Sequence, residues 1–168
     1  LCPNQEEAGK MLSALSRAET DIPADVAMMI ASYLRAFAAP EQAETALELV
    51  QSGFAGKCIA GLPFLAGDGE GEELLLKAAS TGKIPEAAKE DMDEQGLSEK
   101  SSAAGDDPEL ALMLKLSAIS GLGRSKTPQA KELLRKLSIL PADDKPKGNE
   151  PISQARKLRQ AALLARLE

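Results

Sequence analysis

The stretch DPELALMLKLSAISGLGRSKTPQAKELLRKL, residues 107–137, decides the fold of this chain. Its opening pair, Asp107-Pro108, is typical of a helix N-cap and first turn, and the apolar run that follows predicts a strongly buried helix. Glycines within residues 121–123 predict the end of that helix. A second pair, Thr127-Pro128, then starts a helix with leucines along one face. The stretch therefore predicts a helical hairpin.

A short apolar phrase recurs along the chain: an Ala, a Leu four residues on, and a Leu or Val three residues further. This spacing places three side chains on one helix face, and its recurrence predicts stacked helical hairpins. Three copies and a weaker fourth lie at Ala8-Leu12-Leu15, Ala43-Leu47-Val50, Ala130-Leu134-Leu137 and Gly71-Leu75-Ala78.

The composition favours helices throughout. Hydrophobic residues make up 43% of the 168 residues, but aromatic residues supply only 2% and Trp is absent. Core volume must therefore come from Ala, Leu, Ile and Met, which form helices better than strands. No apolar stretch is long enough to span a membrane, so we expect a soluble, all-helical protein. The net charge of -6 makes the chain acidic, and its Ala-rich composition hints at a bacterial source.

Residues 107–137 resemble a HEAT repeat, an armadillo-like helical repeat. In that family a first helix ends in an Ala-x-x-x-Leu-Gly turn and a second carries an Ala-x-x-x-Leu anchor. The matching residues here are Ala118, Leu122 and Gly123, then Ala130 and Leu134. Residues 24–50 and 54–79 are looser copies, so the resemblance covers about half of the chain.

The resemblance implies an α-solenoid of stacked hairpins, a single domain over residues 1–166, and a non-catalytic scaffold that binds another protein or a peptide. It assigns no site residue by position. A closed helical bundle with accidental periodicity is the alternative fold.

Histidine is absent, which excludes His-based triads, dyads and metal sites. The two cysteines, Cys2 and Cys58, are too few for a disulfide framework or a metal knuckle. We expect no catalytic residue, no metal and no cofactor. Cys58 has apolar neighbours and is predicted to be buried. The alternative of another class is a helical enzyme or ligand-binding domain, in which Cys58 is the leading nucleophile.

The ends and one internal segment carry separate expectations. Cys2 precedes a polar tract, so a bacterial lipoprotein or envelope-assembly factor anchored through Cys2 is an alternative to an arbitrary boundary, and a disulfide from Cys2 to Cys58 stays open. The compartment stays open between cytoplasm and envelope. Residues 167–168 resemble a cloning remnant, and residues 95–106 contain little to bury and predict a mobile acidic loop.

Charge changes sign along the chain. Residues 68–110 hold 13 acidic and 4 basic side chains, whereas residues 111–166 hold 12 basic and 4 acidic ones. In a solenoid this pattern polarises the molecule along its axis. The basic end predicts a docking patch for an acidic protein segment or a phosphate-bearing ligand, with a solvated helix face as the alternative. The candidate residues are Lys131, Arg135, Lys136, Arg156, Lys157 and Arg159.

No aromatic residues accompany these cations for base stacking, so we expect no sequence-specific nucleic-acid binding. A second candidate surface lies on the third predicted helix, from about residue 41 to residue 51. Second helices line the concave face of a solenoid, which selects Glu41, Gln42 and Glu44 as candidate contacts.

Two burial expectations can be tested directly. The first helix, capped by Asn4, is predicted to bury Met11 together with Ala8, Leu12 and Leu15. The second helix, after Pro23, carries a broad apolar face that is predicted to lie between neighbouring helices. That face comprises Val26, Met29, Ile30, Tyr33, Leu34 and Phe37.

Overall fold

The structure, a computed structural model, describes residues 5–37, 39–65, 67, 69–83, 107–139 and 153–167. Every regular element in these ranges is helical, which confirms the all-α prediction. The α-helices are α1 (Gln5–Arg17), α2 (Ala24–Leu34), α3 (Ala43–Gln51), α4 (Ala55–Gly61), α5 (Gly69–Thr81), α6 (Pro108–Leu122), α7 (Pro128–Ser138) and α8 (Gln154–Ala165). Three short 3-10 helices are η1 (Arg35–Phe37), η2 (Pro40–Gln42) and η3 (Leu62–Phe64).

The later helices begin where the sequence predicts. The Asp107 carboxylate accepts hydrogen bonds from the backbone N–H groups of Glu109 and Leu110, and the Thr127 hydroxyl accepts one from Ala130 N. Each side chain satisfies amides that have no partner inside the helix. The predicted caps of α6 and α7 are therefore confirmed, whereas Asn4 lies outside the described residues.

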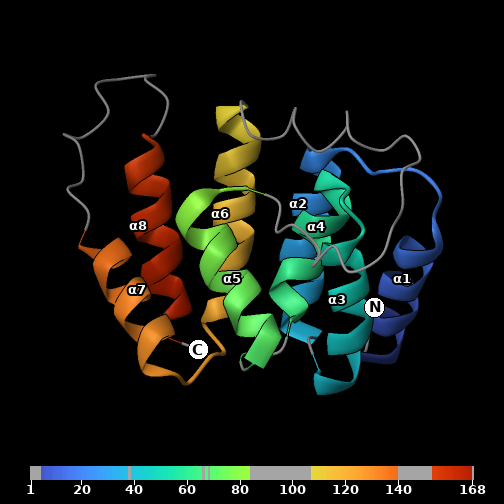
Figure 1. Cartoon of the computed structure of the whole chain (residues 1–168), viewed down its shortest axis with the longest axis horizontal. Coiled ribbons are helices and arrows are strands. Elements are labelled where there is room, and N and C mark those ends of the chain that lie inside the picture. Colours follow the sequence, from blue (N-terminus) through green and yellow to red (C-terminus); the bar gives the residue numbers. More distant parts are fainter. Residues whose placement is uncertain are drawn as a thin grey trace, which may run out of the picture.

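The helices pack in successive pairs along the long axis of the molecule. Helix α3 packs on α4, α5 on α6 and α7 on α8, while α2 also packs on α4 and α6 on α8. Helix α1 lies at one end of the long axis, and α7 and α8 lie at the other (Figure 1).

Several helices run in the same direction. The first turns of α2, α4 and α6 line one pocket of about 470 Å³, which contains Asp21, Asp25, Gly56, Asp107 and Glu109. The three N-terminal ends therefore lie together. Helix α8 begins at the same edge of the molecule as α6 (Figure 1).

The core is continuous and built mainly from Ala and Leu. Leu12, Leu49, Leu75 and Leu114 are fully buried in one cluster that reaches Ala162 in α8. Small side chains at many core positions let the helix backbones approach closely.

Gly121 shows how close this approach is. A Cβ atom added there would lie 2.6 Å from Leu75 Cδ2 and 2.7 Å from the Leu62 carbonyl oxygen. The sequence suggested that Gly121 begins a helix break, but α6 continues to Leu122 and Gly123 follows as its C-cap. Gly121 is therefore a packing residue inside the helix.

The predicted burial of the α1 and α2 faces is wrong for four residues. Met11, Val26, Met29 and Tyr33 are exposed. Helix α2 instead buries Ala27, Ala31 and Leu34, because the small Ala27 and Ala31 side chains allow its close packing on α4. Val26, Met29 and Tyr33 are left facing solvent.

Helix α4 ends irregularly near Pro63, which has no backbone N–H to continue the helix. It stops at Gly61 and continues as η3, in which Pro63 occupies the first turn. Cys58 is fully buried in α4, as expected. None of the described helices has the length and apolar run that crossing a bilayer requires. The predicted loop at residues 95–106 lies outside the described residues.

Candidate functional site

Five basic side chains line one pocket at the C-terminal end of the molecule. The pocket has a volume of about 480 Å³, and its other lining residues include Ser125 and Leu134. We call it the basic pocket; its cations are Arg124, Lys126, Lys131, Arg135 and Arg166. They come from the α6–α7 loop, from α7 and from the end of α8. Among the residues that the structure describes, no carboxylate lines it.

Buried contacts hold the α6–α7 loop in place. Ser125 Oγ donates a hydrogen bond to the Gly67 carbonyl oxygen over 2.9 Å, and Thr127 Oγ1 donates one to the buried Glu72 carboxylate. A Cβ atom at residue 67 would lie 2.8 Å from Ser125 Cα, so only glycine allows this approach. Because these contacts hold Ser125 and Thr127, they also hold the backbone of the adjacent Arg124 and Lys126 at the pocket wall.

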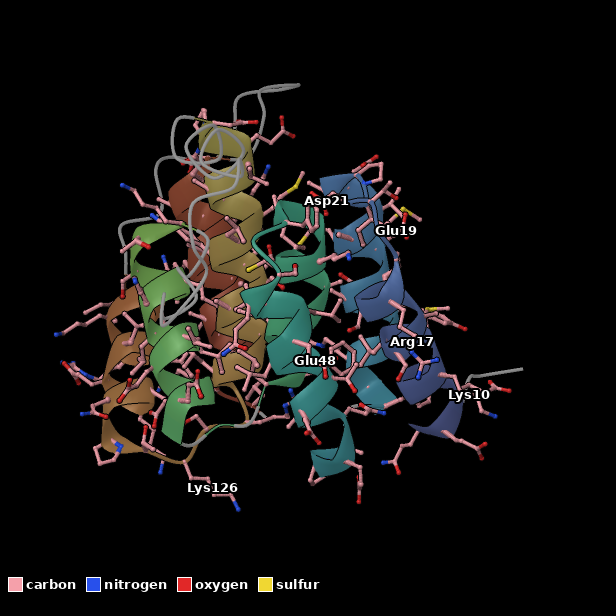
Figure 2. All side chains as sticks on the ribbon, turned by 45° about the vertical axis from the view of Figure 1, so that its right-hand side comes forward. Lys10, Arg17, Glu19, Asp21, Glu48 and Lys126 are labelled. Carbon is pink, nitrogen blue, oxygen red and sulfur yellow. The ribbon has the colours of Figure 1, made fainter. Side chains whose placement is uncertain are left out.

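The α6–α7 loop also borders a second pocket. This pocket has a volume of about 390 Å³ and is lined by Gly67, Arg124, Lys126 and Thr127. Because Arg124 and Lys126 line both pockets, the cationic surface extends from α7 across the loop. Lys126 projects into solvent, far from Asp21 and Glu19 at the other end of the molecule (Figure 2).

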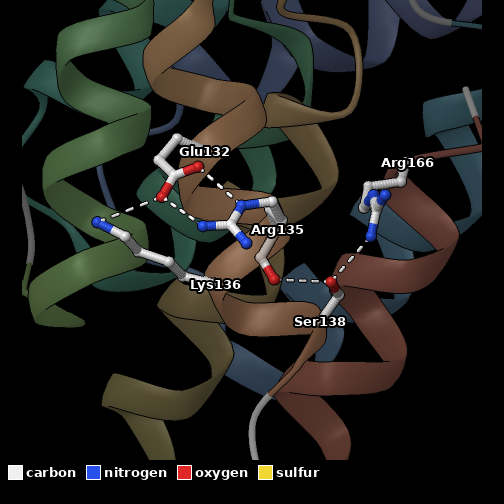
Figure 3. A network of polar contacts seen from close by, with 5 residues as sticks. All are labelled: Glu132, Arg135, Lys136, Ser138 and Arg166. Carbon is white, nitrogen blue, oxygen red and sulfur yellow. Dashed lines mark hydrogen bonds and ion pairs between the residues drawn. The ribbon is translucent and has the colours of Figure 1, made fainter.

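Helix α7 places Lys131 and Arg135 one turn apart on the same face. The buried Leu134 anchors this part of the helix to the core. Arg135 Nε and Nη2 donate to the two oxygens of Glu132 over 2.9 and 3.0 Å, a two-point contact on the helix surface (Figure 3). The hydrogen bond from Arg135 holds the pKa of Glu132 below its usual value.

The end of α8 completes the pocket. Arg166 Nη1 donates to Ser138 Oγ over 3.0 Å, and Ser138 Oγ donates to the Arg135 carbonyl oxygen over 2.7 Å (Figure 3). These contacts connect the last turn of α8 to α7. They hold the exposed Arg166 side chain beside α7.

The structure brings together only part of the predicted basic patch. Lys131 and Arg135 line the basic pocket. Lys136 instead approaches Glu132, with 3.7 Å between Nζ and Oε1. The α8 cations Arg156, Lys157 and Arg159 lie nearer the start of that helix and do not line the pocket.

Sequence reasoning missed Arg124, Lys126 and Arg166 as pocket residues. Arg124 and Lys126 flank Ser125 in a five-residue turn between two helices that the sequence predicts. Their position beside α7 could therefore have been predicted. Arg166 had no comparable signal, because its contact with α7 depends on how α8 packs.

The second predicted surface loses one of its three residues. Gln42 is buried, and its amide serves the backbone: Nε2 donates to Gln5 O over 2.8 Å and to Phe37 O over 3.3 Å, while Oε1 accepts from Ala39 N. It is therefore wrong as a partner contact. Glu41 lines a pocket of about 300 Å³, and Glu44 is exposed but does not line it.

The Cys58 thiol is unsuited to nucleophilic chemistry. Burial, reinforced by the nearby Asp21 carboxylate, raises its pKa to about 12. A thiol with that pKa carries almost no thiolate at neutral pH. Within the described ranges no three carboxylate or thiol groups are arranged as metal ligands, and Cys2 lies outside those ranges.

Neither family models, curated proteins nor solved structures match this chain. The resemblance to HEAT repeats therefore rests on the sequence pattern of the chain alone.

Proposed function

We propose that this protein is a non-catalytic helical scaffold that binds an acidic segment of another protein in the basic pocket. The observation that carries the proposal is the convergence of five basic side chains from three segments on one pocket. Like charges at close range repel one another, so their convergence favours a site that an acidic ligand stabilises.

The Glu132 contact supports a carboxylate as the ligand chemistry. Arg135 already donates hydrogen bonds from two nitrogen atoms to the Glu132 carboxylate. A Glu or Asp of a partner segment would accept hydrogen bonds in the same geometry. Lys126 and Lys131 line the same pocket and offer further cationic groups. We expect the partner segment to compete with Glu132 for Arg135.

A HEAT-like stack is the architecture that we propose for this scaffold. Its support is the shared direction of α2, α4 and α6 and the packing of α3 on α4, α5 on α6 and α7 on α8. In such a stack the curvature creates an extended concave binding surface, which second helices line. The proposal takes α7, which carries Lys131 and Arg135 of the basic pocket, as one of these second helices.

The test measures binding of a fluorescein-labelled, Glu-rich peptide by fluorescence anisotropy. The variant with Lys131→Glu and Arg135→Glu should bind at least about tenfold more weakly, because two attractive charges become repulsive. The matched control carries Lys10→Glu and Arg17→Glu on α1, at the other end of the molecule (Figure 2). It makes the same change in net charge but should lose less than about twofold.

Three results would contradict the proposal. The first is equal loss in the two variants, which means that net charge alone attracts the peptide. The second is equal binding of a control peptide with Gln in place of Glu. The third is displacement of the Glu-rich peptide by millimolar inorganic phosphate. Such a pocket would not prefer the peptide over phosphate, and it would be assigned to a phosphate-bearing ligand.

A further inference from the structure

The smaller pocket at the α6–α7 loop adjoins the basic pocket. We call it the loop pocket; it has a volume of about 390 Å³ and is lined by Gly67, Arg124, Lys126 and Thr127. Lys126 lines both pockets. Its side chain is exposed and projects into solvent (Figure 2). A ligand that occupied both pockets would therefore contact Lys126.

Helix α7 connects the two pockets. Thr127, the N-cap of this helix, lines the loop pocket, whereas Lys131 and Arg135 line the basic pocket. The three residues are spaced four positions apart, so they follow one side of the helix. Lys131 and Arg135 are both exposed. The two pockets therefore form one track along α7, with Lys126 at one end and Arg135 at the other.

The length of this track sets the spacing of the acidic groups that would fill it. Thr127 and Arg135 are eight positions apart, which is about 12 Å along a helix that rises about 1.5 Å per residue. An extended chain advances about 3.3 Å per residue, so four residues cover about 13 Å. Side chains four positions apart on an extended chain also point to the same side. Two such acidic side chains could contact Lys126 and Arg135 together.

The lining of the two pockets favours an extended ligand over a helical one. A helical ligand binds through an apolar face, which requires an apolar groove. Among the described residues that line the two pockets, only Leu134 and Ala165 have apolar side chains, and both are buried. An extended acidic segment needs no such groove, because its charged side chains make the contacts.

We propose that the partner segment is extended, lies along α7 and carries two acidic residues four positions apart. One of them contacts Arg135 and Lys131 in the basic pocket, and the other contacts Lys126 at the loop pocket. This inference rests on the proposed function, because it specifies the acidic segment that the basic pocket binds. It makes Lys126 the residue that selects the spacing of the two acidic groups.

Short unlabelled peptides that compete with the fluorescein-labelled Glu-rich peptide test the spacing. The spaced peptide is Gly-Ser-Glu-Ser-Gly-Ser-Glu-Ser-Gly, and the adjacent peptide contains the same residues with its two Glu side by side. Fluorescence anisotropy should show at least about threefold stronger competition by the spaced peptide, because only its two Glu reach both pockets. A proline peptide, with Pro in place of the central Gly of the spaced one, should compete at least as strongly. Proline is compatible with an extended chain but interrupts a helix.

A substitution at Lys126 tests which residue selects the spacing. The variant Lys126→Gln should bind the spaced peptide about threefold more weakly and the adjacent peptide within about 1.5-fold of the unaltered chain. The matched control is Lys136→Gln, which removes the same charge from α7 at a residue that lines neither pocket. It should leave the difference between the two peptides unchanged. Both lysines are exposed, so both variants should fold.

Equal competition by the spaced and adjacent peptides would overturn the inference, and so would an equal loss for both peptides in Lys126→Gln. Weaker competition by the proline peptide would mean that the segment binds as a helix. In these cases the proposed function still stands if the variant with Lys131→Glu and Arg135→Glu loses the Glu-rich peptide and the α1 control does not. If that variant binds the Glu-rich peptide as tightly as the unaltered chain, the proposed function fails and this inference fails with it.

Discussion

The two ends of the molecule use charged and polar side chains in opposite ways. At the α1–α4 end, Asp21 accepts hydrogen bonds from the backbone N–H groups of Gly56 and Lys57, and the Lys57 ammonium donates to the carbonyl oxygens of Ser16 and Ala18. At the α7–α8 end, Lys131 and Arg135 face a pocket open to solvent. The difference teaches that hydrogen bonds to the backbone mark a structural polar residue, while several cations around one pocket mark a candidate site.

The contrast is clearest between a buried lysine of α4 and a lysine of the basic pocket. Lys57 is buried, and its ammonium also lies 5.0 Å from the centre of the Phe54 ring. Lys131 lies among other cations at the protein surface. The first stabilises the fold, and the second is available to a ligand.

The largest expected effect is at the close approach of α4 to the segment before α2. The change Gly56→Ala would place a Cβ atom 1.9 Å from the Ile22 carbonyl oxygen. We expect it to lower the free energy of unfolding by more than about 3 kcal/mol, because backbone must move. Urea denaturation measures the change.

The matched control is Gly9→Ala in α1, where the nearest atoms to an added Cβ lie 3.9 Å away. Alanine favours the helix there, so the same substitution should stabilise by about 0.5 kcal/mol. A similar loss in the two variants would show that α4 does not need this close contact.

Removal of the Asp21 carboxylate should have the next largest effect. In Asp21→Ala the amides of Gly56 and Lys57 lose their acceptor, so we expect the free energy of unfolding to fall by about 2 kcal/mol. Asp25→Ala, which removes an exposed carboxylate in the first turn of α2, is the control and should change it by less than about 0.5 kcal/mol. Equal losses of stability in the two variants would mean that Asp21 acts only as a surface charge and not as the cap of α4.

The buried Cys58 thiol makes stability depend on pH in the alkaline range. Because burial raises its pKa from 9.0 to about 12, the thiol contributes stability below pH 9 and loses that contribution as the pH rises above 9. Between pH 8 and pH 10 the free energy of unfolding should fall by about 1.4 kcal/mol from this group. Denaturant titrations at both values measure it.

Cys58→Ala is the control for this pH dependence, since other groups also titrate in the same range. The variant is less stable at pH 8 because its smaller side chain leaves a cavity. Its loss between pH 8 and pH 10 should nevertheless be smaller than that of the unaltered chain. An identical pH dependence in the two proteins would contradict a thiol buried in its neutral form.

The smallest expected effect on stability belongs to Glu132→Gln at the other end. Glu132, Arg135 and Lys136 are all about half exposed, so their ion pairs are screened by solvent and the melting temperature should not change measurably. Binding of the Glu-rich peptide should become tighter, because the competing carboxylate is gone. Lowered affinity would mean that Glu132 helps to position Arg135 for the ligand.

Local signals predicted the all-helical class and where α6 and α7 begin. The caps at Asp107 and Thr127 depend on residues close together in sequence, which is why they were predictable. The exposure of Met29 and Tyr33 was not, because amphipathic spacing identifies an apolar stripe but not whether a neighbour covers it. The small residues Ala27 and Ala31 decided which face of α2 packs on α4.

The candidate site was predictable only in part for the same reason. Lys131 and Arg135 are one helical turn apart, so sequence spacing alone places them on one face. The other cations reach the pocket through tertiary contacts, such as that between Arg166 and Ser138. Gln42 could not be recognised as structural, because its three partners are carbonyl and amide groups of the backbone.

The Asp21 cap has a kinetic consequence for α4. Amides in the first turn of a helix exchange with solvent deuterium quickly when no acceptor covers them. Here the acceptor for Gly56 and Lys57 belongs to the segment between α1 and α2 rather than to α4. Exchange at these two amides therefore reports how often that segment lifts away from α4, while the rest of α4 stays folded.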